Sequence, residues 1–319
     1  MHKTDRYGGH VDLQQLRYVV AVADTLNFTR AAERCLVVQS SLSHRIAALE
    51  RELGVRLFAR SSRRVELTGA GAAFLVGARE CLAAADRAVA DAAAAAGVVR
   101  GRLGVGVIVT TAAVDVPELL QRYRAEHPEV AVALRSGRSD DLAAAIRAGE
   151  LDIAFLGLPE GERPAGVETV VLDHDEHVLV VPAGHRLAGG SRVTLAQIAG
   201  ETFVDFVAGT PARAQSDQAF TAAGLVREVA YEAGVVELIT RLVGRGLGVA
   251  LLPSAFIRPL AAGDPELALV PLADGPHRLE YLAWSRFNPS PATRAMLDVL
   301  GVRPAASDRP GTDGHSHGG

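Results

Sequence analysis

Residues 16–71 carry the most informative pattern of this 319-residue chain: LRYVVAVADTLNFTRAAERCLVVQSSLSHRIAALERELGVRLFARSSRRVELTGAG. Apolar residues recur at helical spacing in three short segments, and only residues 35–38 separate the second segment from the third. Two short apolar runs follow, at 57–60 and 64–67, around a turn of serines and arginine that suits a hairpin. Three helices with a tight turn and a small hairpin predict a winged helix-turn-helix domain over residues 12–69.

The third helical segment begins with small hydroxyls, an amide and an arginine, while Leu42 and Ile46 fall on its inner face. Such side chains at the start of the second helix of a helix-turn-helix suit base edges and phosphates, and nearby arginines suit phosphates. A solvated polar face is the alternative. Because Val38 cannot cap this helix, we expect Ser40 or Ser41 to do so. The predicted DNA-binding residues are Thr29, Arg30, Arg34, Gln39, Ser40, Ser41, Ser43, His44, Arg45, Arg51, Arg60, Arg63 and Arg64.

Formal charge is divided unequally along the chain. Residues 1–68 hold eleven Lys and Arg against seven Asp and Glu, a net +4, whereas the remainder nets −8. A basic N-terminal part on an acidic body predicts an anionic partner for the N-terminal part alone.

Composition and cysteine usage favour an ordinary globular protein. The hydrophobic fraction of 49% is enough for a real core, and two cysteines, Cys35 and Cys81, cannot build a disulfide framework. Because the sequence has no run of about 18 uncharged apolar residues, we expect a soluble, reduced, cytoplasmic protein with no membrane partner. The polar ends, residues 1–11 and 303–319, lack apolar periodicity and predict disordered tails.

Residues 69–96 predict one long alanine-rich helix, which Thr68 can cap and Gly97 can end. Apolar residues step along it by four and three, and a seam of that period needs a partner helix. Packing on its own domain is the alternative, but a helix between two domains has little else to cover its apolar stripe. We therefore expect the linker helix, residues 70–97, to pair protomers. The predicted dimerisation residues are Phe74, Ala78, Cys81, Leu82, Ala85 and Val89.

Residues 101–302 alternate strand-like and helix-like segments, which predicts parallel sheets in an α/β body. A helix is expected over 140–149 with Ser139 as its cap. About 200 residues suit two small lobes better than one sheet. We expect residues 101–165 with 268–302 to form one lobe and residues 166–267 the other.

Sequence motifs that would indicate other functions are absent or wrongly placed. The glycines from Gly244 to Gly248 resemble a dinucleotide-binding loop, but they follow a helix and precede a strand, the reverse of the required order. The sequence has no GxSxG elbow, P-loop or HExxH motif. His174 and His177 flank two acidic residues, yet neighbours in a strand point to opposite faces. We expect no catalytic site, no metal site and no cofactor.

The stretch 16–71 resembles the N-terminal domain of LysR-type transcriptional regulators, most specifically in FTRAAE, LSHRIAALERELGVRLFAR and RRVELTGAG. The later phrases HPEVAVAL, LRSGRSDDLAAAIRAGELDIAF, VLVVPAGHRLA and LVGRGLGVALLP resemble the effector-binding domain of that family, so the likeness covers nearly 12–300. The chain departs from the family at Val38 and Ser40, where Ser and Pro are common.

This resemblance implies a homo-oligomer, usually a dimer of dimers. Its winged helix-turn-helix binds double-stranded promoter DNA, a linker helix pairs protomers, and a two-lobed α/β domain of the type 2 periplasmic-binding-protein kind takes a small co-inducer. RNA polymerase is a possible further partner. A small-molecule receptor or enzyme that uses its helix-turn-helix only for interaction is the alternative hypothesis.

The predicted α/β lobes indicate where an effector would bind. In doubly wound lobes, ligands bind beyond the carboxyl ends of strands, where helix N-termini present free N–H groups. Hydroxyls at those places suit a small anion such as a carboxylate, whereas simple helix capping is the alternative. The predicted effector-binding residues are Thr110, Thr111, Ser136, Gly137, Ser139, Val204, Phe206 and Thr210.

Overall fold

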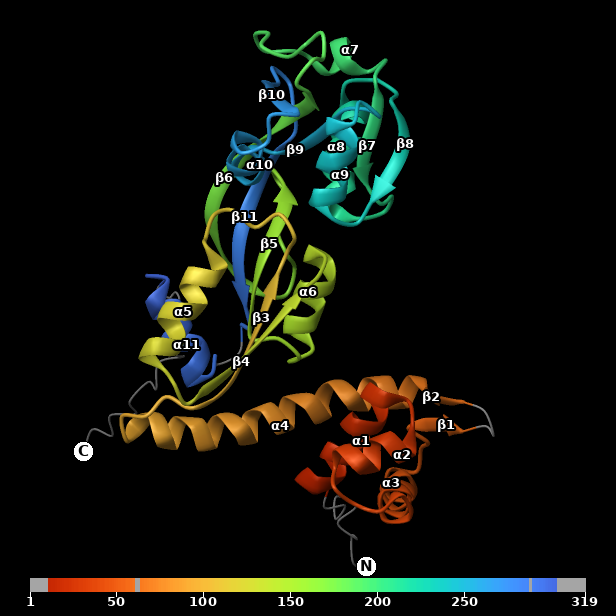
Figure 1. The fold of residues 1–319 in the computed structure, drawn as a ribbon. Coiled ribbons are helices and arrows are strands. Elements are labelled where there is room, and N and C mark those ends of the chain that lie inside the picture. Colours follow the sequence, from red (N-terminus) through yellow and green to blue (C-terminus); the bar gives the residue numbers. More distant parts are fainter. Residues whose placement is uncertain (1–10, 61–63, 287–288, 303–319) are drawn as a thin grey trace, which may run out of the picture.

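The computed structural model describes residues 11–60, 64–286 and 289–302. An N-terminal helical part, called the head below, is followed by one long helix and an α/β part (Figure 1). The predicted tails lie outside the described residues, Val11 excepted. The head consists of α1 (Leu13–Thr25), α2 (Phe28–Arg34), α3 (Gln39–Leu53), β1 (Phe58–Arg60) and β2 (Val65–Leu67).

The helices of the head begin where side chains can satisfy their free N–H groups. Asp12 forms a capping box at α1, and Asn27 accepts hydrogen bonds from the first turn of α2. Helix α3 is different: Val38 occupies the N-cap position without a side-chain bond. Ser40 and Ser41 lie inside the first turn, so the prediction that one of them caps α3 is wrong. Both hydroxyls therefore stay on the exposed start of α3.

The antiparallel hairpin of β1 and β2 is held to the helices by two side chains. Glu50 of α3 accepts hydrogen bonds from the backbone N–H groups of Leu57 (2.9 Å) and Phe58 (3.1 Å). Thr68 caps the long helix and donates to the carbonyl of Arg56 at 2.6 Å. The wing is therefore fixed to α3 on one side and to the long helix on the other.

The long helix α4 (Gly69–Ala95) passes so close to the wing that only glycine fits at Gly71. A Cβ there would lie 2.0 Å from the carbonyl oxygen of Leu57. We expect Gly71→Ala to destabilise the head by about 1–3 kcal/mol, because backbone must move to admit the methyl group. Gly77→Ala is the matched control, since its Cβ would meet nothing within 4 Å. It should stabilise the helix by up to about 1 kcal/mol. Urea unfolding followed by circular dichroism measures both, and equal gains would refute the close approach.

One end of α4 packs against its own head. Phe74 contacts the core of the head, and Ala78 is 2% exposed. Ala78 thus serves intramolecular packing, which corrects its prediction as a dimerisation residue, whereas for half-buried Phe74 that role stays a prediction. Of the others, Cys81 and Val89 are exposed, and Leu82 and Ala85 are half-buried. No helix in the described part of the chain has both the length and the apolar character to span a bilayer.

The α/β part is built on a seven-stranded sheet of order β10-β6-β11-β5-β3-β4, with β9 also paired to β6. Strands β7 and β8 form a separate parallel pair. Its elements are β3 (Gly101–Val107), α5 (Val116–Glu126), β4 (Val130–Ser136), α6 (Ser139–Arg147), β5 (Ile153–Pro159), β6 (Glu168–Pro182), α7 (Leu195–Ile198), β7 (Thr202–Phe206), α8 (Pro211–Ala222), β8 (Glu228–Ala233), α9 (Val236–Gly244), β9 (Ala250–Pro253), α10 (Ser254–Ala262), β10 (Leu267–Pro271), β11 (His277–Trp284) and α11 (Pro291–Val299).

The predicted parallel pairing holds for only part of this sheet. Strand β3 is parallel to β4 and β5, but β11 is antiparallel to both β5 and β6. Strands β9 and β10 are also antiparallel to β6. The sheet is mixed because β6 carries the chain to the far half of this part and β11 brings it back (Figure 1).

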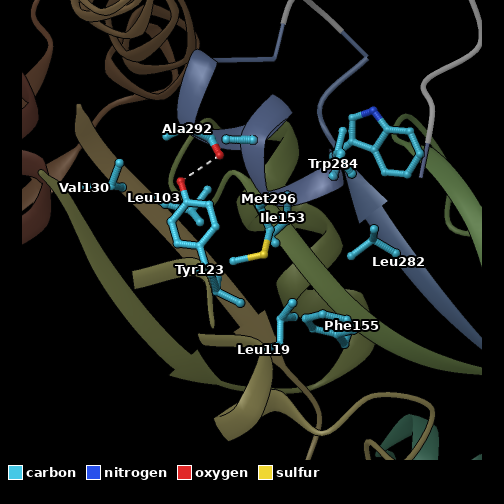
Figure 2. Packing of buried hydrophobic residues seen from close by; sticks show 13 residues of the cluster. Leu103, Leu119, Tyr123, Val130, Ile153, Phe155, Leu282, Trp284, Ala292 and Met296 are labelled. Atoms are coloured by element: carbon cyan, nitrogen blue, oxygen red, sulfur yellow. Dashed lines mark hydrogen bonds between the residues drawn. The ribbon is translucent and has the colours of Figure 1, made fainter. Parts of the chain in front are cut away.

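In the described α/β part, buried apolar side chains pack in two groups on each side of this crossover, and the larger group on each side marks one half of this part. One surrounds Tyr123, Phe155 and Trp284, and the hydroxyl of Tyr123 donates to the carbonyl of Ala292 at 2.9 Å (Figure 2). The other is centred on β9, α9 and the second half of β6. Strand β10 pairs with that half of β6, whereas the predicted boundary at residue 268 put it with the first lobe.

Candidate nucleic-acid interface and effector cleft

Six of the predicted DNA-binding side chains lie on the first two turns of α3. Leu42 and Ile46 are buried in the core of the head, which turns the polar side of α3 outward. The side chains exposed there are Gln39, Ser40, Ser41, His44 and Arg45. Ser43 is half-buried, and its hydroxyl accepts from the Gln39 amide at 2.9 Å. The first two turns of α3 thus present a row of donors and acceptors.

The predicted arginines are spread over the head, on α2, α3 and the hairpin, and most of those described have contacts within it. Arg45 lies 3.6 Å from the Asp12 carboxylate with half its side chain exposed, so the pair contributes little. Arg51 and Thr29 are exposed on α3 and α2, and Arg63 lies outside the described residues. The other contacts are Arg30 to the Thr25 carbonyl (2.7 Å), Arg34 to Asp24 (2.9 Å), Arg60 to Glu50 (3.5 Å) and Arg64 to Glu66 (3.1 Å).

In the α/β part, the hydroxyls predicted to bind an effector already have protein partners. The Thr110 hydroxyl accepts from the Arg278 guanidinium at 2.8 Å. The Ser139 hydroxyl donates to the Gly157 carbonyl (2.9 Å) and accepts from its N–H (3.1 Å), which ties α6 to β5. The prediction that Ser139 caps α6 is therefore wrong, because Arg138 holds that position, without a side-chain bond.

The remaining predicted effector residues differ in their positions. Thr111 donates to the Ile108 carbonyl at 3.1 Å, and α5 begins only at Val116, so neither Thr110 nor Thr111 stands at a helix start. Thr210 caps α8, and its hydroxyl accepts from the Arg213 N–H at 3.3 Å.

Two predicted effector residues belong to the core instead. Val204 and Phe206 lie within β7, and both side chains are buried in the apolar group around α9. They do not lie beyond the strand, which corrects their assignment to an effector site. Ser136 is exposed at the end of β4, and the Gly137 N–H donates to the Val107 carbonyl at 3.0 Å.

A buried ionic cluster, which the sequence reasoning missed, lies where β6 and β11 cross between the two apolar groups. The Arg278 side chain is 1% exposed, and its guanidinium lies 3.2 Å from Asp175 and 2.5 Å from Glu280. It also donates to the Thr110 carbonyl at 2.9 Å. The Glu280 carboxylate accepts from the backbone N–H groups of Ala112 and Ala113. The cluster thus fixes the loop after β3 to both crossing strands.

Burial governs the protonation of this cluster. It raises the pKa of Glu280, and the Asp175 carboxylate adds to that shift, while Arg278 and the two N–H groups oppose it. His177 is also buried, which together with the Arg278 charge lowers its pKa to about 3, so the imidazole is neutral at pH 7. A sign of the cluster in the sequence is the spacing of Arg278 and Glu280, because residues two apart in a strand share one face.

Helix α8 joins the two halves of the α/β part and carries two buried polar groups. The Gln215 Oε1 and the Ser216 Oγ are buried, and neither has a hydrogen-bond partner among the described residues. Helix α8 packs against β5 and β7. Near it, Arg138 donates to the Gly209 carbonyl at 2.9 Å, and Gln218 donates to Glu162 at 3.2 Å. Buried polar atoms without a protein partner mark places where a ligand or water can complete the hydrogen bonding.

Metal-binding side chains do not cluster in the described part of the chain, where no group of three His, Cys, Asp or Glu residues is arranged to hold an ion. Cys35 is half-buried and Cys81 is exposed, and both are free thiols.

Comparison with known proteins agrees with this architecture. Residues 13–72 match the family model "Bacterial regulatory helix-turn-helix protein, lysR family", and residues 96–303 match "LysR substrate binding domain". The uncharacterised HTH-type transcriptional regulator YnfL of Escherichia coli K12 is 34% identical over 297 residues, which covers 89% of this chain and 96% of that protein. The Hca operon transcriptional activator HcaR of the same strain is 32% identical, with 93% and 99% covered.

Solved structures lead to the same conclusion. Full-length OxyR from Pseudomonas aeruginosa has a TM-score of 0.72 and 28% identity, with 95% of this chain and 100% of that chain covered. Full-length CbnR in complex with its target DNA has a TM-score of 0.61 and 26% identity, with 91% and 99% covered. The chain belongs to the LysR family of bacterial transcriptional regulators.

Proposed function

We propose that this regulator binds promoter DNA sequence-specifically, as a homo-oligomer, with α3 in the major groove. The observation that carries the proposal is the exposed row of polar side chains at the start of α3, held outward by buried Leu42 and Ile46. Side chains of this kind at a recognition-helix N-terminus can contact base edges, while exposed arginines beside them contact phosphates. The likeness to a CbnR structure that contains target DNA supports the same docking.

Arg45 and Arg51 provide the test, because both are exposed on α3, but Arg45 lies in its second turn and Arg51 in its last turn. Arg45→Ala should weaken binding by about 1–3 kcal/mol to a duplex from upstream of the gene for this chain, and by much less to a random duplex. Arg51→Ala should weaken both duplexes alike and reduce the salt slope by about one unit. Gel shifts over a salt series measure both. An equal loss on the two duplexes for Arg45→Ala would show a phosphate contact and remove Arg45 from base recognition.

We further propose that protomers pair through the apolar stripe of α4 from Cys81 to Val89. Cys81, Leu82, Ala85 and Val89 form this stripe, and Val89 is 62% exposed. An apolar stripe on a long helix is stabilised by a partner helix. We also propose that the protein is cytoplasmic, because promoter DNA and RNA polymerase are found there.

The effector is proposed to be a small, anionic molecule that binds between the two apolar groups of the α/β part. The N-terminus of α8, capped by Thr210, favours negative charge, and the buried Gln215 and Ser216 on that helix supply unused polar atoms. Thr110 and Ser139 would have to exchange their present partners to contribute. A thermal-melting screen of small carboxylates tests the proposal. The control is a double variant that carries both Thr210→Val and Gln215→Leu. A compound that raises the melting temperatures of the parent and of this variant by the same amount would place the site elsewhere.

A further inference from the structure

One carboxylate of the head is shared between two guanidinium groups from different parts of the molecule. The Oδ2 atom of Asp24, at the end of α1, lies 2.9 Å from Arg34 of the helix-turn-helix. Its Oδ1 atom lies 2.7 Å from Arg79 of α4. The other terminal nitrogen of Arg79 pairs with Glu150, in the turn between α6 and β5. The ion pairs therefore form an unbroken chain from the α/β part to α2.

The middle of this chain is shielded from solvent. The Arg79 side chain is 19% exposed, compared with 56% for Arg34 at the outer end. Partly buried charges interact more strongly than charges on an open surface, and salt screens them less. All four side chains line one groove between α1, α4 and the α/β part. A change at Glu150 can therefore alter the charge balance at Asp24.

We propose that Arg79 is a positioning residue that couples Glu150 to the phosphate-binding Arg34 through Asp24. The proposal rests on the proposed function, because Arg34 matters only if the head binds DNA. Asp24 has one negative charge to divide between two guanidinium groups. When Arg79 takes more of that charge, Arg34 keeps more of its own positive charge for a phosphate. When Glu150 holds Arg79 instead, Asp24 neutralises Arg34.

The position of Glu150 links this chain to the proposed effector cleft. Helix α6 begins at Ser139, which is hydrogen-bonded to Gly157 of β5, and Glu150 follows the other end of the same helix. A helix moves as a unit, so a ligand that displaced the start of α6 would also displace Glu150. The ion pairs convert that movement into a change of DNA affinity.

We expect opposite effects from neutralising Arg79 and from neutralising its partner Glu150, measured with the full chain on an upstream duplex and on a random duplex. Arg79→Gln leaves Asp24 to Arg34 alone and should weaken binding about three- to tenfold, with a smaller salt slope. Glu150→Gln releases Arg79 to Asp24 and should strengthen binding about two- to fivefold. In the Arg79→Gln background, Glu150→Gln should have no further effect.

Arg87→Gln is the matched control. Arg87 lies two turns further along α4 and lines the same groove, and no ion pair or hydrogen bond of its side chain occurs within the described residues. Its replacement should leave affinity unchanged. Suppose the parent binds DNA, but both single variants shift its affinity in the same direction, or their effects add in the double variant. Either result would overturn the coupling and leave the proposed function standing. Failure of the parent to bind either duplex would overturn the proposed function as well.

Discussion

Leu82→Glu is expected to separate the protomers and to lower affinity for promoter DNA by at least about 100-fold. Leu82 is half-buried in the apolar stripe of α4 and lines a pocket with Val20 and Ala21 of α1. In a paired helix, the new carboxylate would be buried without a partner, which is strongly unfavourable. Two half-sites about one helical turn apart require two linked heads, so a lone protomer loses the gain from simultaneous binding.

Ala84→Glu is the matched control for this substitution. It adds the same charge two residues further along the same helix, at an exposed position on nearly the opposite side. Sedimentation velocity should show the parent and Ala84→Glu as oligomers and Leu82→Glu as a monomer. An intact Leu82→Glu oligomer would place the protomer contact elsewhere.

Arg278→Met should destabilise the α/β part by about 3–5 kcal/mol, because it leaves two buried carboxylates without their cation. Asp175 and Glu280 are both buried beside Arg278, and the loop that carries Thr110 loses two hydrogen bonds at the same time. Partial protonation of Glu280, whose pKa is already raised by burial, can offset only part of this cost.

Arg286→Met is the comparison for that experiment. Arg286 pairs with Glu168 at 3.1 Å, but both side chains are about half exposed, so the change should cost no more than about 1 kcal/mol. Trp284 is the one tryptophan of the chain and is buried in the first apolar group, which makes its fluorescence a direct report of unfolding in urea. A midpoint for Arg278→Met equal to that of Arg286→Met would contradict the role of the cluster.

The head could be predicted from sequence almost element by element, because its interactions are local. Thr68 and Gly97 mark the ends of α4 as expected, and the hairpin lies where the alternation predicted it. The start of α3 could not be predicted from capping preference. Val38 satisfies no N–H group there, and the serines that could have capped the helix remain inside its exposed first turn.

Long-range pairing explains what the sequence did not show in the α/β part. The first half of β6 contains the charged run from Asp173 to His177, which has no apolar alternation, yet this half pairs with β11. The antiparallel direction of β11 follows from chain connectivity, which no local pattern records. Ser139 matches the preference for a cap, but a neighbouring strand competes for its hydroxyl.

Ion pairs between distant segments were likewise beyond local patterns. Arg79 looks like an ordinary exposed charge on an alanine-rich helix, and only the folded chain brings it between Asp24 and Glu150. Arg278 and Asp175 are 103 residues apart in the sequence. The chemistry of each residue type was visible, but not the partner that gives it a role.

A footprint of the full chain on DNA from upstream of its own gene, at physiological salt with excess random competitor, tests the central claim most directly. We expect protection of two half-sites separated by about one helical turn or a multiple of it. Affinity for that DNA should exceed affinity for random duplex by at least about 1,000-fold. Equal affinity for the two, or no protection at any concentration, would contradict sequence-specific promoter binding through α3.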